Sequence, residues 1–260
     1  MAKDQTVLFH STVFGPIHSR RLGTSLGINL LPDDGKVCTF DCVYCEAGYN
    51  AQGTGTTGLP LPERVERDLE AKLRDMKSRG ESLDVITFSG NGEPTLHPRF
   101  AEVVEIVNRL RDKYYPEART SVLTNSTRIF DPRVAEALKL VDNNILKLDS
   151  AIEPTMRLID NPTEKLFTVE RLVEGLRQFA GQGIIQTMFL RGSHNGRPID
   201  NTTPEEVDAL IEAYRRIGPK SVMIYTIDRS TPEENLEKVG REELLDIARR
   251  IREAGIEVSV

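Results

Sequence analysis

All three cysteines of the 260-residue chain, Cys38, Cys42 and Cys45, lie within one stretch of eight positions. Three thiols cannot all pair within one chain, so a disulfide framework is not expected. In a reducing compartment, clustered thiols indicate metal, redox or nucleophilic chemistry. The spacing Cys-x3-Cys-x2-Cys suits three irons of a [4Fe–4S] cluster, whose full ligation takes a fourth cysteine. An iron without a protein ligand is open to an outside ligand, which is typical of a catalytic metal site.

A structural zinc ion is the alternative occupant of these thiols. Such a site needs four ligands, usually from two separated Cys or His pairs. His97 or His194 could supply the fourth ligand only by returning from another strand end. The zinc interpretation therefore depends on a tertiary contact that the cysteine spacing does not provide.

Strand-like and amphipathic helical segments alternate along the whole chain. We expect strands at 25–32, 83–90, 119–125, 144–150, 184–192 and 221–228, with a short last strand at 256–260. Helices are expected at 61–80, 99–115, 132–141, 168–183, 203–218 and 241–255. This alternation implies an α/β fold with parallel strands and right-handed crossovers. Six strong units are too few for a closed eight-unit barrel, so an open partial barrel or a doubly wound sheet would fit.

The composition is that of an ordinary globular protein in one domain, residues 1–260, with 38% hydrophobic and 28% charged residues. The formal net charge of −6 argues against a broad nucleic-acid-binding surface. No apolar run approaches the roughly 18–20 residues of a membrane helix, and the N-terminus lacks the order of a signal peptide. We expect a cytoplasmic protein with no membrane partner.

Unusual polar residues follow each predicted strand. The cysteines follow the first, and "SGNGEPTLHP", "TNST", "KLDS", "RGSHNGRPIDN" and "YTIDRSTP" end or follow the next five. Because the carboxyl ends of parallel strands meet at one edge of a sheet, these residues are predicted to form one site.

The stretch "CTFDCVYCE" (38–46) resembles the cysteine motif of the radical S-adenosylmethionine (radical SAM) enzymes, with Tyr44 at the aromatic position. "NGEP" (91–94) is similar to the Gly-Gly-Glu-Pro motif of that family, with Asn91 in place of the first glycine. The resemblance implies a partial (β/α)6 barrel, a [4Fe–4S] cluster and SAM. It further implies that SAM chelates the open iron and is cleaved by one electron. The resulting 5′-deoxyadenosyl radical would abstract hydrogen from a substrate.

The resemblance also implies roles for residues at the strand ends. Glu93 would accept hydrogen bonds from the SAM amino group, and the backbone at Gly92 would hold the methionyl end. Without the cysteines, this stretch would be interpreted as an ordinary turn. Asn125 and Ser126 would make polar contacts to the ribose or carboxylate.

Two further residues at strand ends could contact SAM. Arg191 could neutralise the SAM carboxylate, or be a surface arginine. Tyr225 could flank the adenine, or belong to the core.

Strand alternation places Lys147 and Asp149 on one face and Leu146 and Leu148 on the other. Opposite charges on one face of a central strand predict an interior polar site, and we expect Lys147 and Asp149 to be catalytic, with Asp149 also near the cofactor. The alternative is a structural ion pair with a partner across the barrel.

The flanks resemble a subgroup related to the tRNA wyosine synthases, through "VFGPIHSRRLGTSLGINLLP", "FSGNGEPTLHP" and "YTIDRSTPEENLEKV". Those enzymes carry a second cluster, for which this chain has no cysteines. The resemblance therefore implies that this chain shares their cofactor chemistry, and it does not imply their substrate. Arg20 and Arg21 could bind a phosphate or carboxylate, and His194 and Asn195 could contact substrate. We expect residues 1–24 to pack on the barrel and the glycine-rich residues 46–60 to form a lid or a connector.

The expected partners are a small-molecule or nucleotide-like substrate and a one-electron donor such as flavodoxin or ferredoxin. Nucleic acid is not expected as a partner. Two other functions stay open. One is an activase that places a glycyl radical on a partner protein, and the other is a non-catalytic Fe–S protein for electron transfer or redox sensing.

Overall fold

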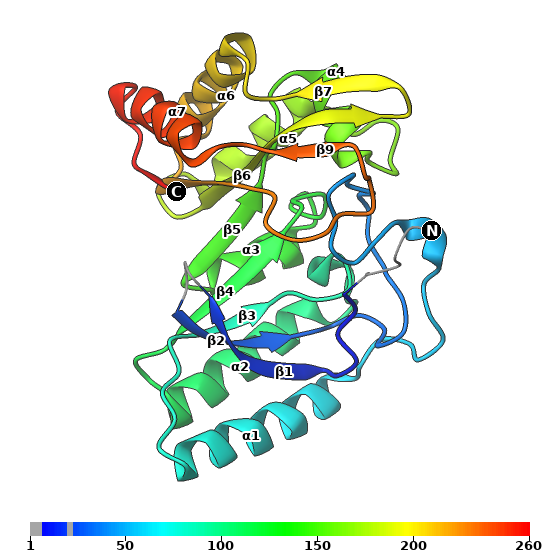
Figure 1. The fold of residues 1–260 in the computed structure, drawn as a ribbon. Helices are drawn as coiled ribbons and strands as arrows, with labels where there is room; N and C mark the ends of the chain where they lie inside the picture. The colour runs from blue at the N-terminus through cyan, green and yellow to red at the C-terminus, as the bar shows by residue number, and fades with distance from the viewer. Residues whose placement is uncertain (1–6, 20–22) are drawn as a thin grey trace.

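The computed structural model describes residues 7–19 and 23–260 (Figure 1). One mixed sheet has the strand order β1-β2-β3-β4-β5-β6-β8-β10, and β7 and β9 pair with β6 beside this path. The strands are β1 (Val13–Ser19), β2 (Gly23–Ile28), β3 (Val85–Phe88), β4 (Arg119–Thr124), β5 (Asn143–Lys147), β6 (Ile184–His194), β7 (Arg197–Asp200), β8 (Ser221–Thr226), β9 (Leu236–Lys238) and β10 (Val258–Ser259).

Every neighbouring pair from β2 to β8, and β8 with β10, is parallel. The helices between them are α1 (Pro62–Ser78), α2 (Phe100–Tyr114), α3 (Pro132–Lys139), α4 (Glu153–Asp160), α5 (Val169–Leu176), α6 (Pro204–Ile217) and α7 (Arg241–Glu253). Strands β2, β3, β4, β5, β6 and β8, with the short β10 at the end, and their crossover helices form the predicted α/β partial barrel, which confirms the fold class.

The helices form where one apolar stripe can face the sheet. In α1, Val65, Leu69 and Leu73 recur at helical spacing and are fully buried, and Pro62 occupies the first turn. At the start of α6 the Thr203 hydroxyl accepts a hydrogen bond from the Glu206 amide, and the left-handed Gly218 ends the helix. In Figure 1, α1 and α2 lie below β2 and β3, and α6 and α7 lie at the other end of the sheet.

Three features of the fold are absent from the sequence prediction. The predicted first strand is the second arm of an antiparallel hairpin, β1–β2. Helix α4 follows β5 directly, where no helix was expected. β6 runs on past the barrel and pairs antiparallel with β7 and β9, which makes a three-stranded extension at the carboxyl edge.

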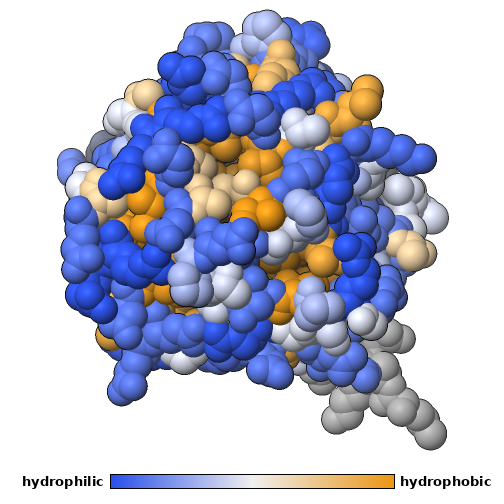
Figure 2. Space-filling view, turned by 90° about the horizontal axis from the view of Figure 1, so that it is seen from above, coloured by the Kyte–Doolittle hydropathy of each residue, from blue (hydrophilic) through white to orange (hydrophobic). Residues whose placement is uncertain are grey.

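The face seen from above in Figure 2 has hydrophilic ridges, with apolar side chains in the recesses between them. This is the end of the molecule at which α6 and α7 lie in Figure 1. Within the described residues, none of the helices has the length and apolar character required to span a bilayer.

Candidate active site

The loop that carries the three cysteines is fixed on one side by the loop after β3. Val37 pairs with Gly92 in a parallel bridge, in which the Val37 amide donates to the Asn91 carbonyl (3.0 Å) and the Glu93 amide donates to the Val37 carbonyl (3.0 Å). A Cβ atom at Gly92 would lie 2.0 Å from the Val37 carbonyl oxygen, and the φ of Gly92 is +131°. Only glycine allows this approach, so "NGEP" positions the cysteine loop directly.

The other side of the cysteine loop is fixed by the end of α4. The Asp41 amide donates to the Asp160 carbonyl (3.0 Å), and the Val43 amide donates to the Ile159 carbonyl (3.0 Å). Phe40 pairs with Pro162 in an antiparallel bridge. The cysteines are therefore carried on backbone that is hydrogen-bonded both to the loop after β3 and to the end of α4.

Asn91, which replaces the family's first glycine, has a structural role. It is fully buried, and its side chain accepts from the Phe9 amide (2.8 Å) and donates to the Phe9 carbonyl (3.0 Å) and the Pro32 carbonyl (2.7 Å). The substitution thus ties the N-terminal segment to the motif loop. Beyond this segment, Arg20 and Arg21 lie outside the described residues.

Glu93 is a buried carboxylate that joins two strand ends. It accepts from the backbone and hydroxyl of Thr95, from the Thr124 hydroxyl (2.7 Å) and from the Asn125 amide (2.6 Å). Burial raises the pKa of Glu93, while these hydrogen bonds act in the opposite direction. The carboxylate is held in one position at the carboxyl edge of β3 and β4.

Asn125 lies beside the first cysteine, and Ser126 follows it at the end of β4. The Asn125 side-chain amide is 3.5 Å from the Cys38 sulfur and donates to the Thr39 hydroxyl (2.9 Å). Ser126 is fully buried with φ +67°, and its hydroxyl has no hydrogen-bond partner among the described residues. An orphaned buried hydroxyl on a strained residue is typical of a ligand site.

A buried cluster of polar side chains contacts Cys42 through Asp160. Lys147 contacts Asp149 and the Tyr44 hydroxyl, and its ammonium is 3.0 Å from Asp160. The Tyr44 hydroxyl also bonds Asp149, and the Cys42 thiol is 3.8 Å from Asp160. Burial lowers the pKa of Lys147, but the two carboxylates prevail and raise it. Lys147 is therefore a held cation, and Asp160 is a member of the site that sequence reasoning missed.

Other predicted residues lie further along the carboxyl edge. Arg191 pairs with Glu243 of α7 and bonds Thr202. Tyr225 packs in the apolar cluster beside Tyr44.

His194 lies in the β6–β7 hairpin, where its Nδ1 is 2.5 Å from Glu233 and its Nε2 is 2.9 Å from the Asn195 amide. Glu233 also accepts from the Tyr49 hydroxyl (3.3 Å). This hairpin and the loop with Glu233 thus contact the segment that follows the cysteines, although no described contact joins Arg191 to the motif loops.

The glycine-rich segment 46–60 is hydrogen-bonded near both of its ends to the loop that follows β2. The Asp34 carboxylate accepts from the amides and hydroxyls of Thr56 and Thr57. Asn50 bonds Asp41 (2.7 Å) through its amide. Whether the segment acts as a lid stays a prediction.

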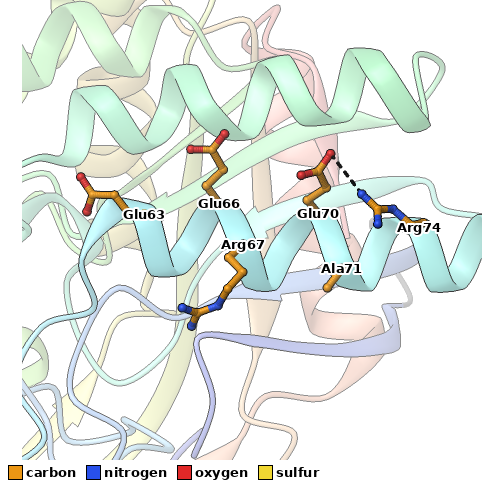
Figure 3. A pocket seen from close by; sticks show the side chains of 6 residues that line it. All are labelled: Glu63, Glu66, Arg67, Glu70, Ala71 and Arg74. Atoms are coloured by element: carbon orange, nitrogen blue, oxygen red, sulfur yellow. Dashed lines mark ion pairs between the residues drawn. The ribbon is translucent and has the colours of Figure 1, made fainter.

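A hollow beside α1 (Figure 3) is not part of this site. Its carboxylates, Glu63, Glu66 and Glu70, point toward α2 and pair there with Arg99, Arg109 and Lys113. The hollow is therefore bordered by ion pairs that join two neighbouring helices.

The residues at the carboxyl edge fit a [4Fe–4S] cluster with SAM. Three partly buried thiols lie on one fixed loop, and the Asn125 side chain is 3.5 Å from the Cys38 sulfur. The next residue, Ser126, has an unsatisfied buried hydroxyl. Burial raises the pKa of the Cys38 thiol to about 12, so a bound cation is required to hold it as thiolate. No three described His, Cys, Asp or Glu side chains converge as the ligands of a single ion.

The family model for the radical SAM superfamily matches residues 34–189. The chain is 32% identical to a UPF0026 protein of Synechocystis, over 85% of this chain and 77% of that protein. It is 27% identical to a UPF0026 protein of Helicobacter pylori, over 84% of this chain and 66% of that protein. The chain belongs to the radical SAM superfamily and, within it, to the UPF0026 proteins.

The chain also matches part of a longer protein. It is 28% identical to a protein of Brachyspira hyodysenteriae named GTPase Obg, over 99% of this chain and 36% of that protein. The chain thus spans about a third of this relative and 66% of the Helicobacter pylori protein.

Solved structures share the fold. A radical SAM methyltransferase from Sphaerobacter thermophilus has a TM-score of 0.67 at 16% identity, over 91% of this chain and 65% of that one. TYW1 with a bound lysine–pyruvate adduct has a TM-score of 0.61 at 16% identity, over 90% of this chain and 75% of that one. The superfamily implies a [4Fe–4S] cluster and SAM as cofactors, with Cys38, Cys42 and Cys45 as its cysteine motif.

Proposed function

We propose that this protein is a radical SAM enzyme that acts on a small-molecule or nucleotide-like substrate at the carboxyl edge of its barrel. When bound, the cluster and SAM supply a 5′-deoxyadenosyl radical that abstracts hydrogen from the substrate. The observation that carries the proposal is the double anchoring of the cysteine loop, by Gly92 on one side and by the end of α4 on the other. An electron-transfer protein has no need of a buried carboxylate at Glu93 or of an unsatisfied buried hydroxyl at Ser126.

The proposed site residues have four roles: binding the cluster, binding SAM, forming an interior polar site and contacting substrate. Cys38, Cys42 and Cys45 bind the cluster. Glu93, with Gly92, Asn125 and Ser126, holds the methionyl end and ribose of SAM, and Tyr44 and Tyr225 flank this region. We also propose that Arg191 contacts the SAM carboxylate. In the structure, Arg191 forms an ion pair with Glu243.

Lys147, Asp149 and Asp160 form the interior polar site. Because Asp149 and Asp160 both contact Lys147, its amine stays protonated and can donate hydrogen bonds to an anionic or carbonyl oxygen of the substrate. A protonated amine is not a nucleophile, so we do not carry the lysine–pyruvate adduct of the TYW1 structure over to Lys147.

Relatedness to the wyosine synthases is part of this proposal. Two TYW1 structures share the fold, with TM-scores of 0.61 and 0.53. At 16% and 15% sequence identity, these two structures support a shared fold and not a shared reaction. The three cysteines allow one cluster, so the wyosine reaction itself is not proposed. His194 and Asn195, together with Arg20 and Arg21, are the proposed substrate contacts.

One experiment separates this proposal from a non-catalytic Fe–S protein. The protein is reconstituted without oxygen, reduced with dithionite and incubated with SAM, and 5′-deoxyadenosine is quantified by chromatography. We expect 5′-deoxyadenosine, and none in a Cys42→Ala variant. An intact, reduced cluster that yields no product would favour electron transfer instead. A physiological one-electron donor, flavodoxin or ferredoxin, would replace dithionite in the cell.

A further inference from the structure

Lys36 is a lysine buried inside the cysteine loop. Its side chain is 1% exposed. Lysines are almost never buried to this degree without an ionic partner, because burial strips water from the ammonium. Two positions before the first cysteine, on a loop, an exposed lysine would be the ordinary expectation.

The protein supplies only part of the partnership that this ammonium needs. Lys36 Nζ donates to the Gly48 carbonyl at 2.7 Å and lies 3.4 Å from Asp41 Oδ1. The same Asp41 oxygen accepts the Asn50 amide at 2.7 Å, and the Asp41 side chain is 20% exposed. A distant, shared and partly hydrated carboxylate neutralises a buried charge incompletely.

The ammonium lies within the segment that carries the three cysteines. Lys36 is two positions before Cys38, and Gly48, whose carbonyl accepts its hydrogen bond, is three positions after Cys45. The loop from Val37 to Gly48 closes around the ammonium, since Gly48 bonds it directly and Asn50 bonds the carbonyls of Phe40 (3.1 Å) and Cys38 (3.4 Å).

We propose that the Lys36 ammonium is the buried counter-charge of the [4Fe–4S] cluster, and that it favours one-electron reduction of the cluster. This inference rests on the cluster of the proposed function. A cluster held by three thiolates is anionic and gains one more negative charge when a one-electron donor reduces it. A fixed positive charge in a low dielectric therefore stabilises the reduced form more than the oxidised form. Lys36 is a positioning residue that acts through the cluster, without touching SAM or substrate.

The test is a redox titration of the reconstituted protein, followed by the EPR signal of the reduced cluster. Lys36→Gln removes the charge, and Lys36→Arg keeps it. Lys220→Gln is the matched control, because Lys220 is exposed and lies just before β8, at the opposite edge of the sheet from the cysteines. We expect K36Q to lower the equilibrium constant for reduction at least tenfold, which is about 59 mV toward negative potential. K36R should stay within threefold of wild type, and K220Q should be unchanged.

If K36Q binds no cluster, its potential cannot be measured, and the iron content of the two variants tests the proposal instead. If K36R then keeps four irons and K36Q loses them, the positive charge is required and the proposal stands. If both variants lose the cluster, the shape of lysine matters and its charge does not, which overturns the proposal. A K36Q cluster with the wild-type potential also overturns it. A wild-type protein that binds no cluster would instead contradict the proposed function.

Discussion

Gly92 and Val37 approach each other so closely that a Cβ on Gly92 would lie 2.0 Å from the Val37 carbonyl oxygen. The glycine of the motif turn after β3 is thereby in contact with the residue that precedes the first cysteine. The glycine of "NGEP" is needed for the backbone of the cysteine loop as well as for any contact with SAM.

Gly92→Ala should therefore displace the cysteine loop. We expect the free energy of unfolding to fall by about 1–3 kcal/mol, the usual cost of overpacking, and the iron content after reconstitution to fall below half. Gly240→Ala is the control, since that glycine has an ordinary φ of −65° and no atom lies within 4 Å of its added Cβ. A G92A protein with full iron and wild-type stability would show that the loop tolerates a side chain there.

Asn91→Gly would restore the family's glycine and remove three hydrogen bonds to Phe9 and Pro32. At about 0.5–1.5 kcal/mol for each bond, we expect the free energy of unfolding to fall by about 1.5–4.5 kcal/mol. The Phe9 amide should exchange with solvent much faster, which NMR hydrogen exchange measures. Asn195→Gly, at an exposed turn with φ +51°, should leave stability unchanged. If the Phe9 amide of N91G exchanged as slowly as in wild type, Asn91 would not be what holds the N-terminal segment to the motif loop.

Glu93→Gln should keep the cluster and weaken SAM binding at least tenfold. The amide loses the charge that attracts the SAM amino group, and its NH2 faces donors such as the Asn125 amide. Anaerobic calorimetry measures the affinity. Thr95→Val removes a hydroxyl that donates to the same carboxylate without changing its charge, so its effect should stay below threefold. Equal SAM affinity in E93Q and wild type would mean that the methionyl contact lies elsewhere.

Asn144 is buried in β5 with neither side-chain atom hydrogen-bonded within the described part of the chain. It lies on the same strand face as Leu146, toward the helices. Asn144→Leu, of similar size, should raise the free energy of unfolding by about 1–3 kcal/mol. Asn143→Leu is the matched control: Asn143 donates to the Ser121 hydroxyl (2.9 Å), so its loss should destabilise. Thermal unfolding of the reduced apoprotein measures both, and a lower Tm for N144L would be the contrary result.

The parallel barrel and the cysteine motif could be predicted because they have local signals. Hydrophobic periodicity marks β3 and α2, and three thiols within eight positions are typical of a loop that binds a metal cluster. Helix α4 was missed because it has eight residues and no side-chain cap, although Pro154 in its first turn and the left-handed Asn161 at its end are readable signals.

Side-chain partners set by tertiary contacts could not be predicted. Asp160 joins the site only because α4 returns to the cysteine loop. Nothing in the sequence separates the buried Lys36 from an exposed lysine, since its burial depends on the path of residues 37–50 around it. Lys147 and Asp149 were predicted from strand alternation, which is local, whereas their partners Tyr44 and Asp160 come from other elements.

The most direct test of the account is the EPR spectrum of the dithionite-reduced protein before and after addition of SAM. If three cysteines hold a [4Fe–4S] cluster with one iron open, SAM should bind that iron and change the g-values of the reduced cluster. A fully reduced cluster whose spectrum is unchanged at saturating SAM would contradict the account.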